Sequence, residues 1–153
     1  MLAAGLYKAG YKGNFMGGDA ITSSDFIAGA GRHEGMLATS IGQPLGDDDR
    51  ARNFVGAYDA AGFPPDSYGS YGPLAYDAGT VLIKALGRVL PQVDDVQEAR
   101  PRLIQAIDDL GGVDGVTGRH TFDEFGDTTN RTLTISEVSG GEWHNVFSGQ
   151  YHE

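Results

Sequence analysis

The start of the chain constrains its fold most, because it predicts a helix that runs directly into a short strand. Apolar residues between Leu2 and Ala9 follow a helical spacing, and Gly10 is a typical residue to end that helix. Residues 14–16 are apolar in part and flanked by glycines, which predicts a short buried strand. Such a pair forms the second half of a β-α-β unit that lacks its first strand. The alternative is an N-terminal helix that simply begins the domain.

The rest of the chain alternates between helical and strand patterns, which is typical of an α/β fold. The strongest helix is expected over residues 73–90, where the apolar face is broad and prolines flank the pattern. Pro101 is expected to break or kink a later helix near its middle. Strands on either side of Gly140-Gly141 predict a C-terminal hairpin. The other expected elements are helices at residues 23–31, 47–61 and about 95–110, and strands at residues 34–41 and 120–122.

Composition excludes several classes of function. The 153 residues suit one domain, and 11 Lys and Arg against 21 Asp and Glu give a net charge of −10. An acidic chain lacks the clustered cations that bind nucleic acid or an anionic membrane surface. Cysteine is absent, which excludes disulfides, thiol nucleophiles and most zinc sites. The sequence also has no apolar run long enough to span a bilayer, and we expect no signal peptide at its start.

Motifs for nucleotides, metals and catalysis are weak. The glycine-rich residues 29–35 resemble a dinucleotide fingerprint, but they leave a helix and enter a strand, which is the wrong direction. The acids at residues 47–49 lack the alternating spacing of a calcium loop, and no serine lies in a nucleophile-elbow context. We therefore expect no catalytic residue, no metal and no cofactor. The histidines, which also lack metal-site spacing, are His33, His120, His144 and His152.

Asp19 differs from the other carboxylates, because it follows the strand expected at residues 14–16 through two glycines. In open α/β sheets, ligands bind just beyond the carboxyl ends of strands. A carboxylate in that position is suited to accept a charge-assisted hydrogen bond from a ligand ammonium group. The alternative is that Asp19 caps the helix that follows, and the local sequence leaves both roles open.

Aromatic residues gather near the start of the helix expected over residues 73–90. Aromatic side chains at a helix entrance can wall an apolar ligand pocket, although they more often belong to the core, and Tyr76 in particular favours the core. The residues of this group are Tyr58, Phe63, Tyr68, Tyr71 and Tyr76.

Three runs of sequence together resemble one known family. They are GYKGNFMGGDAITSSDFIAGAGRHEGMLAT (residues 10–39), YGPLAYDAGTVLIKAL (residues 71–86) and GVTGRHTFDEFGDTTNRTLTISEVSGGEW (residues 115–143). In this order they resemble the extracytoplasmic branched-chain amino acid binding proteins of ABC importers, which are the leucine/isoleucine/valine-type, type I periplasmic binding proteins. The resemblance covers essentially the whole chain.

The resemblance implies a partial type I periplasmic-binding-protein fold with Rossmann-like α/β lobes, truncated at its N-terminus and ending in a β-hairpin. It identifies this chain with the C-terminal portion of such a protein. Residues 1–40 would be part of the C-terminal lobe, and residues 41–120 part of the N-terminal lobe. Residues 121–153 would be a crossover and a hairpin that return to the C-terminal lobe.

The resemblance also implies two ligand-binding residues. Asp19 falls where the family has a carboxylate, often Glu, that binds the ligand's ammonium group, and Tyr71 falls at an aromatic position that lines the side-chain pocket. The family's residues that hold the ligand's carboxylate belong to the portion before this chain. We therefore expect this chain alone to bind ligand weakly.

The function that the resemblance implies is solute binding without catalysis. A component of an ABC importer for branched-chain or related amino acids would bind its ligand between two lobes by hinge closure and dock on a membrane permease. The full-length protein would be extracytoplasmic, either periplasmic or a cell-surface lipoprotein. The alternatives are a ligand-sensing receptor domain of the same fold and an α/β enzyme, which would need a nucleophile and a base in one cleft. The truncated chain is expected to self-associate through apolar faces that are left uncovered.

Overall fold

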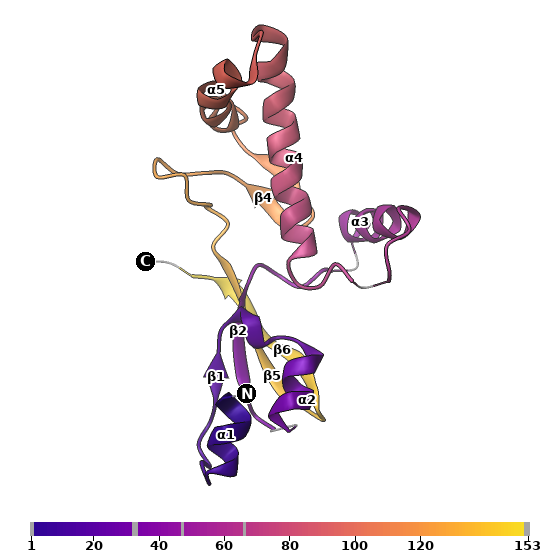
Figure 1. Cartoon of the computed structure of the whole chain (residues 1–153), viewed down its shortest axis with the longest axis vertical. Coiled ribbons are helices and arrows are strands. Elements are labelled where there is room, and N and C mark those ends of the chain that lie inside the picture. The colour runs from indigo at the N-terminus through magenta and orange to yellow at the C-terminus, as the bar shows by residue number, and fades with distance from the viewer. Residues whose placement is uncertain (1, 32–33, 47, 66, 152–153) are drawn as a thin grey trace. The chain divides into compact units, whose positions relative to one another are not determined.

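The computed structural model describes residues 2–31, 34–46, 48–65 and 67–151, which divide into two compact units. Unit 1 comprises residues 1–43 and 131–153, and unit 2 comprises residues 44–130. Both contain helices and strands, so the expected α/β class is confirmed (Figure 1). In the part of the chain that is described, no helix combines the length and the apolarity that crossing a membrane requires.

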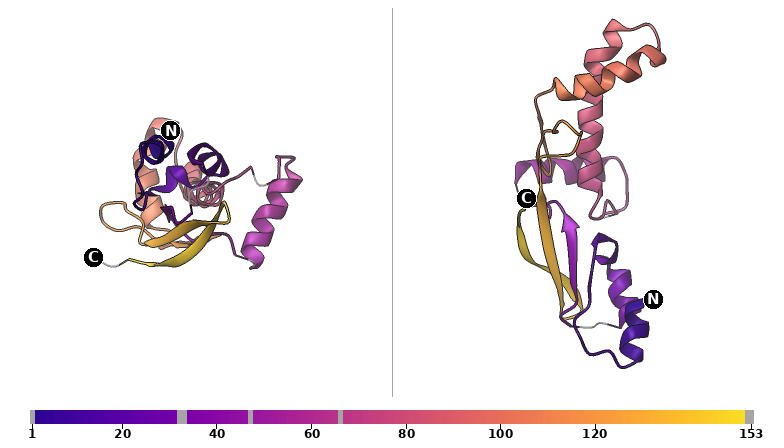
Figure 2. Two further views of the ribbon diagram at one scale, coloured as in Figure 1. Left: turned by 90° about the horizontal axis from the view of Figure 1, so that it is seen from below. Right: turned by 90° about the vertical axis from the view of Figure 1, so that its left-hand side faces the viewer.

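Unit 1 is built on a mixed four-stranded sheet in the order β1-β2-β5-β6. β1 and β2 are parallel, whereas β5 is antiparallel to both of its neighbours. The two α-helices of unit 1 lie on one side of this sheet (Figure 2). The elements of unit 1 are α1 (Leu2–Lys8), β1 (Met16–Gly17), the 3-10 helix η1 (Asp19–Ile21), α2 (Ser24–Ala30), β2 (Leu37–Ile41), β5 (Thr132–Ser139) and β6 (Glu142–Gln150).

The core of unit 1 lies between these helices and one face of the sheet. Phe15 packs against this core, and because successive strand residues point to opposite faces, Met16 lies on the other face and is 54% exposed. The prediction of a buried strand at residues 14–16 is therefore wrong in its burial, since β1 is an edge strand of only two residues. The buried core residues are Ala3, Ile27, Ala30, Met36 and Val138.

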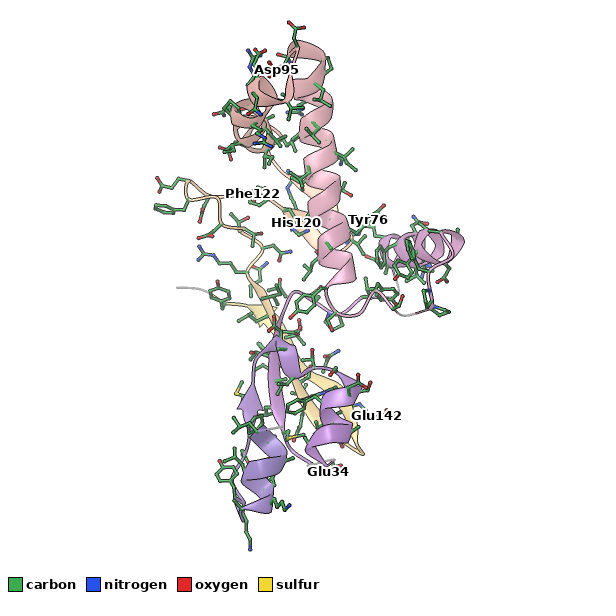
Figure 3. The ribbon with its side chains drawn as sticks, viewed as in Figure 1. Glu34, Tyr76, Asp95, His120, Phe122 and Glu142 are labelled. Carbon is green, nitrogen blue, oxygen red and sulfur yellow. The ribbon has the colours of Figure 1, made fainter. Side chains whose placement is uncertain are left out.

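The β5–β6 hairpin turns through Gly140 and Gly141, as the sequence predicts. Both glycines have positive φ, 62° and 82°, which is the backbone conformation that a tight hairpin turn requires. Glu34, which precedes β2, accepts hydrogen bonds from both glycine amides at 3.0 and 3.2 Å (Figure 3). One exposed carboxylate therefore closes this turn.

Unit 2 consists mainly of helices, and the helix expected over residues 73–90 is confirmed as α4. α4 and α5 pack together through small side chains, Ala85 and Val89 from α4 against Ala99 and Ala106 from α5. The elements of unit 2 are α3 (Asp49–Ala60), α4 (Gly72–Val89), the 3-10 helix η2 (Leu90–Gln92), α5 (Val96–Asp108) and the antiparallel strands β3 (Val113–Gly115) and β4 (Gly118–His120).

Two expectations for unit 2 are corrected: the break of a helix at Pro101, whose alternative was a kink, and the extent of the strand at residues 120–122. α5 is not broken at Pro101, because a proline removes only one backbone donor and Asp95 caps the helix by accepting a hydrogen bond from the Glu98 amide at 2.8 Å. The strand expected at residues 120–122 ends at its first residue, and Phe122 makes only an isolated bridge with Thr128.

The glycine-rich run after α2 ends a helix, as expected. Gly31 is the C-cap of α2 with a φ of 87°, and its amide donates to the Ile27 carbonyl at 3.0 Å. Arg32 and His33 of this run lie outside the described residues, as do Asp47 of the acidic triplet and His152.

Candidate functional site

Asp19 lies in unit 1, directly beyond the carboxyl end of β1. Gly18 follows the strand, and Asp19 is the first residue of η1. Because β1 and β2 are parallel neighbours, their carboxyl ends lie at the same edge of the sheet. Asp19 therefore occupies the edge at which open α/β sheets bind ligands.

The side chain of Asp19 is not a helix cap. α2 is capped by Ser23, whose hydroxyl accepts a hydrogen bond from the Phe26 amide at 3.1 Å. The backbone carbonyl of Asp19 accepts hydrogen bonds from the amide and the hydroxyl of Thr22, at 3.1 and 2.7 Å. Within residues 2–31, 34–46, 48–65 and 67–151, no group donates a hydrogen bond to the half-buried Asp19 carboxylate. The carboxylate is therefore able to accept a hydrogen bond from a donor group of a ligand.

The helix-facing side of the sheet becomes polar toward this same edge. Along β5, Val138 belongs to the core, whereas Ser136 and Thr134 on the same side are buried hydroxyls. The Ser136 hydroxyl donates to Asn145 Oδ1 at 2.9 Å, and the Thr134 hydroxyl donates to the Gly42 carbonyl at 2.8 Å. The sheet surface at the edge that carries Asp19 is therefore lined by polar groups rather than by apolar side chains.

Tyr71 lies in unit 2 as the N-cap residue of α4, and it is 49% exposed. Aromatic rings cluster at this end of the helix, with the closest ring centroids 4.9 to 5.3 Å apart. Phe54 is the buried member. Tyr76, at the end of α4 that faces α3 (Figure 3), is half exposed rather than part of the core, and its ring meets that of Phe54 in a T-shaped arrangement. The cluster comprises Phe54, Tyr58, Phe63, Tyr68 and Tyr76.

The two residues that the resemblance assigns to the ligand belong to different units. Asp19 is part of unit 1 and Tyr71 is part of unit 2, so no single unit brings them together.

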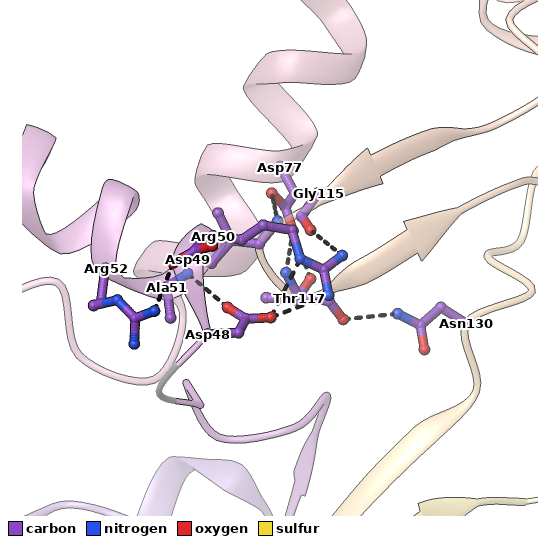
Figure 4. A network of polar contacts seen from close by, with 10 residues as sticks. Asp48, Asp49, Arg50, Ala51, Arg52, Asp77, Gly115, Thr117 and Asn130 are labelled. Carbon is purple, nitrogen blue, oxygen red and sulfur yellow. Dashed lines mark hydrogen bonds and ion pairs between the residues drawn. The ribbon is translucent and has the colours of Figure 1, made fainter.

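A buried carboxylate that the sequence analysis did not single out organises unit 2. Asp77 of α4 is 1% exposed. It accepts hydrogen bonds from the amides of Val116 and Thr117, both at 2.7 Å, and from the Thr117 hydroxyl at 2.6 Å (Figure 4). His120 Nε2 lies 3.1 Å from the same carboxylate. The turn between β3 and β4 is thereby fastened to α4.

These contacts explain why the buried Asp77 carboxyl keeps its charge and why residue 115 is a glycine. Burial by itself raises the pKa of Asp77, but the hydrogen bonds from Thr117, Val116 and His120 outweigh it and hold the pKa below its usual value. A Cβ atom at Gly115 would lie only 2.4 Å from Asp77 Cγ. The backbone of the turn can therefore approach the carboxylate this closely only with glycine at that position.

Two further side chains contact the backbone of the β3–β4 turn (Figure 4). Arg50 Nη1 donates to the Gly115 carbonyl at 3.3 Å, and Asn130 Nδ2 donates to the Thr117 carbonyl at 3.2 Å. Asp48, the N-cap of α3, forms an ion pair with Arg50 at 3.2 Å.

Comparison with known proteins identifies the fold. No family model matches the chain. The leucine-, isoleucine-, valine-, threonine- and alanine-binding protein of Pseudomonas aeruginosa is 30% identical over 138 residues, which are 90% of this chain and 33% of that protein. An ABC transporter substrate-binding protein from Desulfitobacterium hafniense, solved in complex with Leu, is 27% identical, with a TM-score of 0.66 over 95% of this chain and 39% of that one. The chain has part of a type I periplasmic-binding-protein fold.

A leucine-binding protein from Thermotoga maritima shows the same periplasmic-binding-protein fold, with a TM-score of 0.74 over 97% of this chain and 41% of that one. At 24% identity this likeness concerns the fold alone. The chain thus spans between 33% and 41% of the length of these three proteins. Sequence and fold match a portion of the branched-chain amino acid substrate-binding proteins of ABC transporters, which are binding proteins rather than enzymes.

Proposed function

We propose that the chain is part of the solute-binding component of an ABC importer, and that the full-length protein binds a branched-chain or related amino acid. The names of the relatives support the class of ligand. The observation that carries the proposal is the half-buried Asp19 carboxylate, which lies beyond β1 and receives no hydrogen bond from the described residues. An extracytoplasmic location and a membrane permease as partner belong to the same proposal.

In this proposal, Asp19 accepts a hydrogen bond from the ligand's ammonium group, and Tyr71 contributes an aromatic wall for the ligand's side chain. Unit 1 corresponds to part of the C-terminal lobe and unit 2 to part of the N-terminal lobe. Ligand binding works by hinge closure, because a ligand that contacts both lobes stabilises the closed state by its additional contacts there.

The test compares two ligands that differ only in the amino group, measured by calorimetry on the full-length protein. Leucine carries the ammonium group, whereas 4-methylpentanoate has the same carbon chain and carboxylate without it. Asp19→Asn should weaken leucine binding roughly ten- to a hundredfold, the equivalent of one hydrogen bond to a charged group. The same substitution should leave the weaker binding of 4-methylpentanoate almost unchanged.

Asp25→Asn is the matched control, because Asp25 is an exposed acid in the first turn of α2, in the same unit. It should leave the affinity for both ligands unchanged. Equal losses for leucine and 4-methylpentanoate in Asp19→Asn, or no loss for either, would contradict the role of Asp19.

We also propose that the 153-residue chain self-associates when it is produced alone. The face of the unit 1 sheet opposite its helices exposes large apolar side chains: Met16, Ile41 and Phe147 are each more than half exposed. A second copy of the chain would cover such a patch. Light scattering should report a dimer or a larger species, and a monomer at micromolar concentrations would contradict this proposal.

A further inference from the structure

The chain passes between the two units twice, after Gln43 and after Asn130. On the unit 2 side, two residues make hydrogen bonds to one short segment, the β3–β4 turn: Arg50, in the first turn of α3 and seven residues after the first crossing, and Asn130, directly before the second. This turn is the same segment whose amides are held by the buried carboxylate of Asp77.

The first crossing is connected to Asp77 through a single peptide group. The Gly115 carbonyl and the Val116 amide belong to that peptide, which is planar and rigid. Its amide donates to Asp77 at 2.7 Å, and its carbonyl accepts from Arg50 at 3.3 Å. Arg50 is in turn paired with Asp48, at the start of α3 and close to the crossing. Asp77 therefore sets the orientation of the acceptor that Arg50 uses.

The second crossing is connected to Asp77 through Thr117. The amide and the hydroxyl of Thr117 both donate to Asp77, at 2.7 and 2.6 Å, which fixes this residue at two points. Its carbonyl accepts from Asn130 Nδ2 at 3.2 Å, and Asn130 is the last residue of unit 2. The end of unit 2 is therefore also held by a group whose position Asp77 determines.

We propose that Asp77 is a positioning residue that anchors both crossing segments of unit 2 through the β3–β4 turn. The inference goes beyond the proposed function and depends on it only for one consequence. If the full-length protein works by hinge closure, the crossing segments form part of the hinge, and Asp77 fixes where their flexible portion begins on the unit 2 side.

Hydrogen exchange measured by mass spectrometry tests the anchor in the 153-residue chain without any ligand. In Asp77→Asn, an NH₂ group replaces one carboxylate oxygen, so one of the amides of Val116 and Thr117 loses its acceptor and the other keeps only a neutral, weaker one. Exchange at these amides should become roughly ten- to a hundredfold faster. Peptides covering residues 44–50 and residues 128–131 should both exchange faster as well.

Two further variants separate the branches of the anchor. Arg50→Met keeps much of the side-chain stem but removes the donor to Gly115, so exchange should rise in residues 44–50 and not in residues 128–131. Asn130→Ala should give the opposite pattern. Only a change at Asp77 should loosen both segments.

The matched control is Val89→Ala, which opens a small cavity in the α4–α5 core and destabilises unit 2 at a site away from the turn. If Asp77→Asn speeds exchange at the crossings no more than Val89→Ala does, Asp77 is merely structural and the proposal is wrong. Thr117→Val serves if Asp77→Asn does not fold: it removes the hydroxyl that bonds to Asp77 and should speed exchange in residues 128–131 more than in residues 44–50, at smaller amplitude. Because no ligand is involved, failure of the proposed amino acid binding leaves this result unaffected.

Discussion

Each of the two hairpin turns, β3–β4 and β5–β6, is closed by one carboxylate that accepts two consecutive backbone amides. In unit 1, the exposed Glu34 accepts from Gly140 and Gly141 at 3.0 and 3.2 Å. In unit 2, Asp77 accepts from its two turn amides at 2.7 Å and is 1% exposed. The contact is chemically the same. If it is lost at the exposed turn, water can hydrogen-bond to the freed groups, whereas the buried groups of the other turn would stay without a partner.

The buried turn also demands more of its neighbours. A side chain at position 115 would clash with the Asp77 carboxylate, so glycine is required there. Thr117 and His120 supply further hydrogen-bond donors to this carboxylate. At the exposed turn, the two glycines have positive φ, and a Cβ atom at Gly140 would meet no other atom within 4 Å. A buried polar contact thus constrains several residues around it, while an exposed one constrains only the backbone that it touches.

The largest effect is expected for Asp77→Asn, which should lower the free energy of unfolding of unit 2 by about 3 kcal/mol, because buried donors lose a charged acceptor. Urea unfolding followed by far-UV circular dichroism measures it, since the three longest helices belong to unit 2. A loss below about 1 kcal/mol, the size expected for an exposed hydrogen bond, would show that burial does not distinguish the two turns.

Low pH should remove the stabilisation that the Asp77 carboxylate gives to unit 2 in the unmodified chain. The pKa of Asp77 is lower in the folded state than its usual value of about 3.9, so the unfolded state takes up this proton first as the pH falls. The stabilisation is complete above about pH 4 and is lost as the pH falls through the folded-state pKa. The difference in unfolding free energy between the unmodified chain and Asp77→Asn should therefore shrink as the pH falls from about 4 to about 2. A constant difference over this range would be inconsistent with a lowered pKa.

The smallest effect is expected for Glu34→Gln, which makes the same chemical change at the exposed turn. It should lower the free energy of unfolding of unit 1 by no more than about 1 kcal/mol. The fluorescence of Trp143 reports on this unit selectively, because it is the only tryptophan and it packs against the unit 1 core. A loss as large as that of Asp77→Asn would remove the distinction between the turns.

Local sequence patterns predicted the features that depend only on neighbouring residues. The Gly140-Gly141 turn, the end of α2 at Gly31 and the extent of α4 are of this kind. The pattern along β5 did not show that its hydroxyl residues, rather than Leu133 and Ile135, face the helices, because that depends on which side of the sheet the helices cover.

Asp77 was not found from the sequence because its partners are far away along the chain. Val116 and Thr117 lie 39 and 40 residues beyond it. A signal was nevertheless present, since α4 buries every fourth residue and Asp77 is the charged member of the series Pro73, Asp77, Val81, Ala85 and Val89. The role of Asp19 was left open between a cap and a ligand contact, and only the observed cap at Ser23 excluded the first.

Unit 2 is one continuous stretch of chain, whereas unit 1 is assembled from two separate stretches. During synthesis, β1 and β2 emerge before unit 2, but β5, the antiparallel partner of β2, follows only after all of unit 2 has been translated. At about 5–20 residues per second, that delay is on the order of ten seconds. Unit 2 is thus complete while β2 still lacks its antiparallel partner, and the unpaired edge of β2 is open to misassociation until β5 follows.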